Sequence, residues 1–516
     1  MRSARFTTWA VVVTALILLG TFLLGLQPWS NVPGEASETP AGARVLVVLP
    51  FVAQADDPET AFFGVGLADS LISRLSGIKD LKVRPLSASL SLSSQGLSPA
   101  EIGRRLGAAT VMQGSYTKTK DSLKVRVGLM DVDTGAMLLD RELESSLKEI
   151  MRVEVDLVED ALAILTPHLH PDHRVSLTRR QAPNASAHYL YLLARGKMAT
   201  LQSGDVAEVV RLLEEAVSSD PSFAQAHAAL SEASANMVLG GASTDGSWID
   251  RAIASGRRAV FLADGDPEAH YALGYALSAH GDTVGAARES LKALRLDPDH
   301  GPALRQLAVL LAASGAGAPA RHLRDHAREV DPSMELGWID LWLAVVEGTI
   351  DETAAALEAD AEARRKTGGF PEQPIMQLGY VAFLKGDAGA GLRWAAMLEN
   401  VSANAPYTDM VRALALARNG GREAVGRIIE KNHESYWKDW DYATQISQAL
   451  ALTGETEQAL EWLRRSVELG SCHAHLLESS DAFDVLRADP RFGTALGTVR
   501  ERAGEMIRLA RFAGYG

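Results

Sequence analysis

Two consecutive 34-residue units, at residues 267–300 and 301–334, are the feature that most constrains how this chain folds. Small, apolar or proline residues recur at the same seven positions of each unit. In the first unit they are Leu273, Gly274, Leu277, Gly281, Ala286, Ala293 and Pro298. In the second they are Leu307, Ala308, Leu311, Gly315, Ala320, Ala327 and Pro332. Small residues let two antiparallel helices approach closely, the glycine frees the turn between them, and the proline ends the second helix. The period therefore predicts stacked helix-turn-helix units.

This pattern resembles the tetratricopeptide repeat (TPR), whose units stack into an all-α solenoid that binds other proteins and seldom does chemistry. We expect a TPR-like solenoid with a C-terminal cap over residues 184–500. Helical apolar spacing also marks residues 189–200, 207–218, 223–239, 248–262, 336–346, 375–384, 407–418, 442–452 and 457–469. The period blurs after Met334, and residues 481–496 are expected to cover the open end of the stack.

The TPR resemblance also implies which side chains meet a partner. In such repeats the first helix of each unit lines the concave surface, and positions 2, 5, 9 and 12 face a ligand. These positions predict a protein or peptide bound by six residues, namely Glu268, Tyr271, Tyr275, Ser278, Arg305 and Val309. The alternative is that they form ordinary helix surface, because few interface residues carry most of the binding energy.

An apolar, uncharged stretch near the N-terminus predicts one transmembrane signal anchor at residues 7–29. Positive charges precede it, so residues 1–6 are expected as a cytoplasmic stub, and the rest of the chain outside the inner membrane, in the periplasm or beyond. A cleaved signal peptide is the alternative. Residues 30–43, rich in Pro, Gly, Glu and Ser, are expected to form a linker.

Residues 44–166 alternate between strand and helix patterns, which predicts a small α/β domain. The domain resembles the TolB N-terminal-like domain, also called FlgO-like. The matching segments are residues 47–51, 63–67, 101–103, 106–108, 111–115 and 131–135. In relatives with this arrangement, the cytoplasmic end carries a winged-helix DNA-binding domain or an adenylate cyclase domain. Since residues 1–6 leave no room for either, the resemblance implies an output on another chain.

Several residue groups carry side chains that take part in chemistry in other proteins. His168, His170 and His173 have metal-binding side chains, but Pro171 interrupts them and a linker is expected at 167–183. Cys472 with two nearby histidines lacks a second thiolate, because it is the only cysteine. Residues 64–66 lack the Gly-Lys-Ser/Thr of a phosphate loop. We expect no metal, no cofactor and no catalytic residue. The aromatic residues Tyr436, Trp437, Trp440 and Tyr442 favour packing between helices, with an exposed docking patch as the alternative.

The formal net charge of -14 argues against a general nucleic-acid-binding protein, which needs basic patches for phosphates. The sequence thus predicts a multidomain fold: one transmembrane helix, a small α/β domain, then an all-α TPR-like solenoid. The predicted function is a non-enzymatic, membrane-anchored protein-binding scaffold or sensor. The alternative is the sensory half of a split signalling system whose DNA-binding or adenylate cyclase output lies on another chain. An enzyme would need a buried site with perturbed pKa values, which the sequence does not display.

Overall fold

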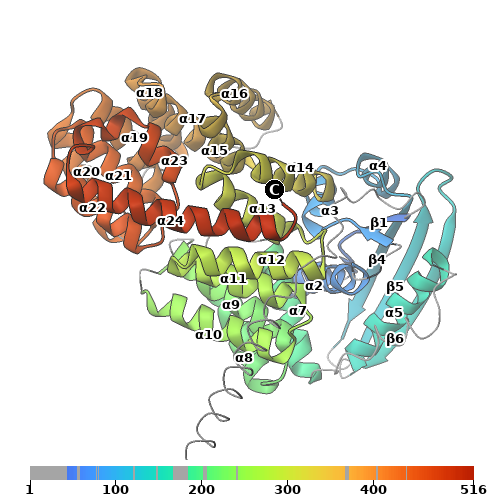
Figure 1. The fold of residues 1–516 in the computed structure, drawn as a ribbon. Helices are drawn as coiled ribbons and strands as arrows, with labels where there is room; N and C mark the ends of the chain where they lie inside the picture. The colour runs from blue at the N-terminus through green and yellow to red at the C-terminus, as the bar shows by residue number, and fades with distance from the viewer. Residues whose placement is uncertain are drawn as a thin grey trace, which may run out of the picture.

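A computed structural model describes residues 44–54, 58–76, 78, 81–119, 122–146, 149–166, 184–200, 206–239, 242–243, 245–366, 371–402, 405–436 and 438–515. In this part of the chain, a small α/β region lies beside a long series of helices (Figure 1). The predicted linker at 167–183, with its three histidines, lies outside the described residues.

A mixed sheet forms the centre of the α/β region, with strand order β3-β1-β4-β5-β6 and β2 paired to β4. β1 runs parallel to β3 and β4, whereas β5 is antiparallel to both β4 and β6. Alternate residues of β5, from Leu123 to Leu129, are fully buried, so one face of this strand packs in the core. The strands are β1 (Arg44–Val48), β2 (Val52–Ala53), β3 (Leu81–Val83), β4 (Thr110–Lys118), β5 (Ser122–Asp131) and β6 (Met137–Ser146).

Helices cover both faces of this sheet. Leu46 and Val48 of β1 pack in one core with α2 and α5, while Val47 packs in a second core with α3 and α4. Ser98 caps α4: its hydroxyl accepts from the amide of Glu101, whose carboxylate accepts from the amide of Ser98. The helices are α2 (Pro58–Leu75), α3 (Leu86–Ser93), α4 (Pro99–Arg105) and α5 (Ile150–Leu165).

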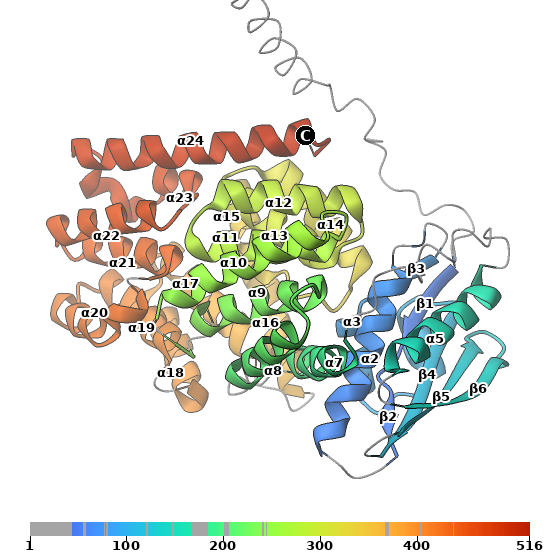
Figure 2. The same ribbon diagram turned by 90° about the horizontal axis from the view of Figure 1, so that it is seen from below.

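The remaining described helices form a TPR-like solenoid of antiparallel pairs (Figure 2). The first four pairs are α7 (Ala185–Ala199) with α8 (Val206–Ser219), α9 (Ala224–Leu239) with α10 (Ser247–Leu262), α11 (Pro267–His280) with α12 (Thr283–Leu296), and α13 (Gly301–Ala313) with α14 (Gly317–Val330). The later pairs are α15 (Gly337–Glu347) with α16 (Ile350–Lys366), α17 (Glu372–Leu384) with α18 (Ala388–Ser402), α19 (Pro406–Arg418) with α20 (Arg422–Tyr436), and α21 (Trp440–Leu452) with α22 (Thr456–Glu468).

The glycines of the 34-residue units make the turns within these pairs. Gly281 and Gly315 adopt positive φ angles of 97° and 87°, a conformation that side chains disfavour. Ala286 and Ala293 of α12 are fully buried, at two of the positions where the repeat places small residues. The helix-turn-helix units predicted from the repeat period are therefore confirmed.

The α/β region packs tightly against the first repeat. α2 and α7 cross so closely that a Cβ atom on Gly66 would lie 1.9 Å from the carbonyl oxygen of Leu192. On Gly196 it would lie 1.8 Å from the carbonyl oxygen of Phe62. Gly66 thus serves helix packing. Further along the solenoid, Arg84 donates hydrogen bonds to backbone carbonyls at the end of α14. One hydrophobic core runs from the sheet into α7, α8 and α9.

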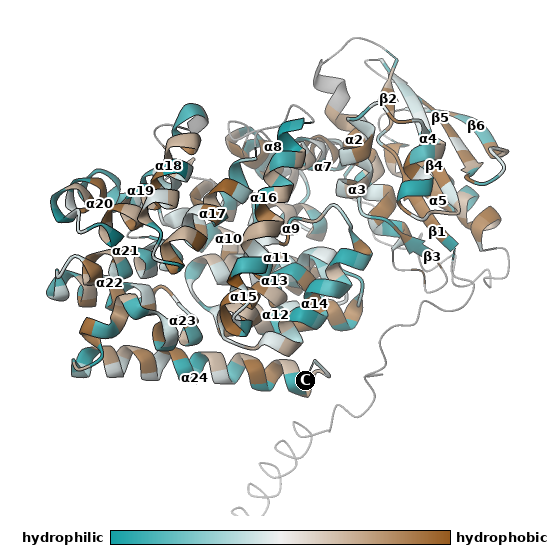
Figure 3. Ribbon diagram, turned by 90° about the horizontal axis from the view of Figure 1, so that it is seen from above, coloured by the Kyte–Doolittle hydropathy of each residue, from teal (hydrophilic) through white to brown (hydrophobic). Residues whose placement is uncertain are grey.

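The far end of the solenoid folds back onto its middle. After α22 the chain forms α23 (Ala474–Ser479), the 3-10 helix η2 (Asp481–Leu486) and α24 (Pro490–Phe512). The hydroxyl of Thr283, at the start of α12, donates to the carbonyl of Gly470 over 3.2 Å. α24 packs against both α22 and α12, and Figure 3 shows hydrophobic and hydrophilic residues alternating along it. It extends beyond the tail predicted at 481–496.

No helix within the described ranges combines the length and the apolar character needed to cross a membrane. On that finding we correct the predicted fold class to a mainly helical solenoid with a small N-terminal α/β region. We also withdraw the predicted localisation as a single-pass protein of the inner membrane. The segment 7–29, on which both predictions relied, lies outside the described residues, as do the predicted stub 1–6 and linker 30–43.

Candidate partner-binding surface

The six residues predicted to bind a partner lie on α11 and α13, the first helices of two neighbouring pairs. We call them the α11–α13 surface: Glu268, Tyr271, Tyr275, Ser278, Arg305 and Val309. The side chain of Arg305 is exposed, and those of Ser278 and Val309 are half-buried. Tyr271 is buried, with its ring 5.5 Å from that of His300. The hydroxyl of Tyr275 donates to Asn236 of α9 over 2.8 Å.

A charged cluster adjoins this surface and draws its members from four helices. The guanidinium of Arg195, on α7, lies 2.7 Å from the carboxylate of Asp69 on α2 and 3.3 Å from that of Glu268 on α11. Glu232, on α9, lies 3.8 Å away from it. Three carboxylates therefore share one guanidinium. Glu232 is the most distant of the three, so its ion pair is weak. The α/β region contributes to the cluster through Asp69.

The surroundings shift the ionisation of these groups in opposite directions. Burial raises the pKa of Glu232 to about 7, and the nearby negative charges of Glu268 and Asp69 add to this against the attraction of Arg195. Burial also opposes ionisation of Glu268, but the hydrogen bond from His300 at 3.0 Å and the charge of Arg195 lower its pKa to about 2. Glu268 is therefore a fixed charge, whereas Glu232 titrates near neutral pH.

Asp69, Arg195 and Glu232 were not among the predicted site residues. Asp69 belongs to a helix far away in sequence, and no repeat position marks it. Arg195 and Glu232 lie on the first helices α7 and α9, as Glu268 does on α11. Extending the repeat alignment backwards from Pro267 would have placed these two residues near the α11–α13 surface, because the first helices lie next to one another in the stack.

The corresponding surface of the later repeats is covered by the chain itself. His473 lies between two indole rings, 4.3 Å from that of Trp342 on α15 and 4.7 Å from that of Trp440 on α21. Asp481 accepts two hydrogen bonds of 2.7 Å from Arg418 on α19. Residues 470–486 therefore occupy the inner face of the C-terminal repeats, and a partner could reach that face only by displacing them.

Cys472 and its two neighbouring histidines lie inside this segment. Cys472 is fully buried, with its sulphur facing the carbonyl of Leu310 on α13. Burial raises the pKa of the Cys472 thiol to about 12 and lowers the pKa of His473 to about 3, so both groups are uncharged at neutral pH. Within the described residues, no three His, Cys, Asp or Glu side chains are placed to share a metal ion.

The aromatic cluster packs between helices, as predicted. Tyr436 is fully buried and its hydroxyl donates to the carbonyl of Pro406 over 2.7 Å. The ring of Tyr442 lies 5.2 Å from that of Tyr436, and Trp440 packs on His473. Trp437 lies outside the described residues. The packing interpretation is confirmed for the three described members.

Comparison with known proteins gives one distant relative. No family model matches the chain, and nothing here confirms the resemblance to the TolB N-terminal-like domain. A protein named putative adenylate cyclase 3, from Rhizobium meliloti (strain 1021), is 26% identical over 254 residues, which cover 48% of this chain and 43% of that protein. The chain therefore spans less than half the length of this curated relative.

Two solved structures resemble the chain weakly. The human IFIT1 dimer with PPP-AAAA has a TM-score of 0.34 and 13% identity, covering 63% of this chain and 91% of that one. Yeast Tom70 has a TM-score of 0.33 and 13% identity, covering 85% of each chain. Scores this low carry no argument, so the class rests on the chain's own geometry: a TPR-like helical-repeat protein with a small α/β region packed on its first repeats.

Proposed function

We propose that this chain is a non-enzymatic protein-binding scaffold that holds a protein or peptide segment on the α11–α13 surface. One observation carries the proposal. Ser278, Arg305 and Val309 keep side-chain surface open to solvent, whereas residues 470–486 cover the inner face of the later repeats. A partner on the first-helix side of the stack therefore meets the α11–α13 surface first.

The chemistry of that surface suits a polypeptide. Arg305 supplies hydrogen-bond donors in a fork that matches a carboxylate, and the weakly paired Glu232 supplies an acceptor for a basic side chain. Tyr275 adds a ring with a polar tip, of the kind enriched at protein interfaces. The acidic balance of the whole chain, -14, disfavours nucleic acid as the partner. We assign the α/β region a positioning role, since its Asp69 orients Arg195.

In-cell crosslinking followed by pull-down and mass spectrometry tests this proposal. We would compare the parent chain with a Ser278→Arg/Arg305→Glu variant, whose substitutions lie on accessible side chains and should leave the fold intact. Arg257→Glu, on the exposed face of α10, is the matched control. We expect a partner captured by the parent and the control and lost by the double variant. The same partners with all three chains would overturn the proposal.

The relative named putative adenylate cyclase 3 favours a second candidate function, in which the chain regulates a nucleotide cyclase on another polypeptide. Cyclic AMP produced by a co-expressed cyclase domain, measured with and without this chain, tests it. A change in cyclase output that Ser278→Arg/Arg305→Glu abolishes would support regulation through the same surface. Equal output with and without the chain would remove this candidate.

A further inference from the structure

The two helices of the fifth pair, α15 and α16, stand apart and leave a cleft that α14 and α17 also line. α16 buries only Leu357 and Ala361, whereas α12 and α14, its counterparts in the regular repeats, bury nine and four of their residues. Six residues join α14 to α15, against four between α12 and α13. The resulting cleft encloses about 850 Å³, within the range of ligand sites, and is lined from α14, α15, α16, α17 and the edge of α3.

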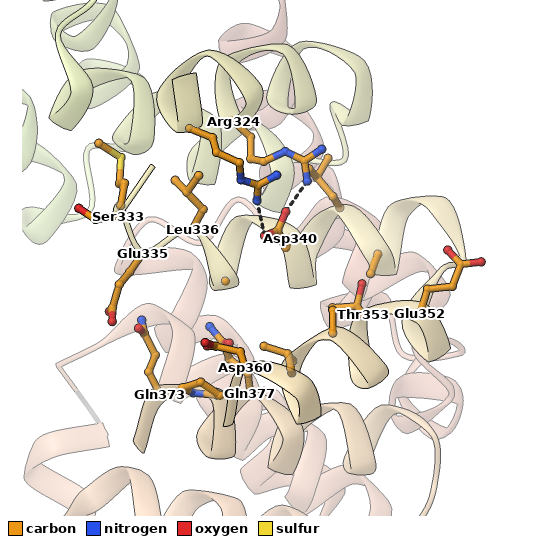
Figure 4. Close-up of a pocket in the computed structure, with 18 of the residues that line it drawn as sticks. Arg324, Ser333, Glu335, Leu336, Asp340, Glu352, Thr353, Asp360, Gln373 and Gln377 are labelled. Atoms are coloured by element: carbon orange, nitrogen blue, oxygen red, sulfur yellow. Dashed lines mark hydrogen bonds and ion pairs between the residues drawn. The ribbon is translucent and has the colours of Figure 1, made fainter. Parts of the chain in front are cut away.

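One side chain in this cleft is buried without a hydrogen-bond partner. Gln377, on α17, is 1% exposed, and its Nε2 has no acceptor among the described residues. Gly337 leaves room for the amide, since a Cβ there would lie 2.6 Å from Nε2. Figure 4 shows Gln377 and Asp360 facing Arg324 and Asp340 across the cleft. Because a buried donor costs free energy until it is paired, Gln377 favours an occupant that brings a carbonyl oxygen.

The charges of the lining favour a positively charged occupant. Five carboxylates and three guanidinium groups line the cleft. Arg324 and Arg328 both pair with Asp340, and Arg364 pairs with Asp360 over 3.0 Å. Glu352 lies exposed on α16, and its carboxylate forms no ion pair with the described residues. The floor is apolar, with Leu336, Leu343 and Leu357.

From these features we propose that the cleft between α14–α15 and α16–α17 binds an extended peptide segment that carries a lysine or arginine. A backbone carbonyl of the segment accepts from Gln377, its basic side chain pairs with Glu352, and an apolar neighbour packs on the leucine floor. The site is separate from the α11–α13 surface, so it goes beyond the proposed function. Experiments on the cleft therefore test it independently of that function.

Fluorescence anisotropy with short labelled peptides tests the site in the full chain. The peptides contain leucine and differ only in a central Lys or Glu, and the lysine peptide is expected to bind at least about tenfold more tightly. Gln377→Leu should weaken its binding about five- to tenfold and leave the melting temperature unchanged or higher, because it removes an unpaired donor. Glu352→Gln should weaken binding about two- to fivefold, while Glu358→Gln, outside the cleft, should not.

Four outcomes would overturn the proposal. They are no binding by either peptide, equal binding by both, a Gln377→Leu variant that loses stability but keeps affinity, and an N-acetyl-lysine amide that competes as well as the peptide. The last would assign the cleft to a small cation. Ala356→Trp, which fills the cleft from its exposed side, should abolish peptide binding. Ser278→Arg/Arg305→Glu should leave it unchanged, which keeps the two proposals distinguishable.

Discussion

Glycines determine how closely the α/β region can approach the repeats. Gly66 of α2 and Gly196 of α7 meet opposite backbone carbonyls at distances that no side chain would allow. A backbone carbonyl cannot rotate away as a side chain can, so a methyl group at either position must push the helices apart. The shared core from the sheet to α9 depends on this contact.

Gly196→Ala should therefore lower the free energy of unfolding by about 1–3 kcal/mol, the usual cost of overpacking. Urea unfolding followed by circular dichroism measures the change. Gly493→Ala is the control, because it lies in α24 with open space around it, and it should raise stability by about 0.5–1 kcal/mol. An unchanged midpoint for Gly196→Ala would contradict the close packing of α2 on α7.

The charged cluster predicts an effect of pH on stability. The pKa of Glu232 rises on folding from 4.5 to about 7, because burial disfavours its charged form. Between these values the folded chain binds more protons than the unfolded chain, so the contribution of Glu232 is full below pH 4.5 and is lost as pH rises towards 7. In Glu232→Gln this loss should vanish. We would measure urea unfolding at several pH values between about 5 and 7. The free energy of unfolding should fall less steeply with pH in Glu232→Gln than in the control Glu358→Gln, and equal slopes would contradict the assignment.

At the scale of helices and strands, the repeat signals located most of the structure. The turn glycines Gly281 and Gly315 and the alternation along residues 122–131 each follow from local chemistry, so they could be read from the sequence. The sequence pattern does not mark three helices of the later pairs, α16, α18 and α20. α16 has few large apolar residues, although acidic residues in its first turn and basic ones in its last complement the helix dipole and could have revealed it. The pattern does not mark α3 either, because half of its residues are serine.

The sparse burial of α16 predicts that it is the least protected helix of the solenoid's middle. Its backbone amides should exchange with deuterium at least about tenfold faster than those of α12, because few apolar contacts oppose its local opening. Hydrogen exchange with mass spectrometry measures both helices in one experiment. Equal protection would mean that α16 packs as tightly as a regular repeat, and the cleft beside it would then be in doubt.

At the scale of the whole molecule, the return of the chain end to the middle repeats could not be predicted. The hydrogen bond from Thr283 to Gly470 joins residues 187 positions apart, and neither position carries a signal for the other. The same holds for the pairing of Asp69 with Arg195 and for the cleft, since each depends on how distant helices are placed. The candidate residues on α11 and α13 could be named because repeat position alone selects them.

Cys472 reports whether residues 470–486 pack on the middle repeats, because it is the only cysteine and packs against α13. Burial raises its thiol pKa to about 12, so the reactive thiolate is scarce in the folded chain. Labelling with iodoacetamide at pH 8 should be at least about a hundredfold slower than in urea-unfolded protein. Labelling at the unfolded rate without urea would show that residues 470–486 do not pack on the middle repeats.

The central claim is that a protein partner meets the α11–α13 surface, and site-specific photo-crosslinking in cells tests it most directly. A photoreactive amino acid would replace Ser278 in one variant, Arg305 in a second, and Arg257 on the outer helix α10 in a third. The account predicts that the same protein is crosslinked from positions 278 and 305 and not from 257. A partner crosslinked from 257 and from neither surface position would contradict it.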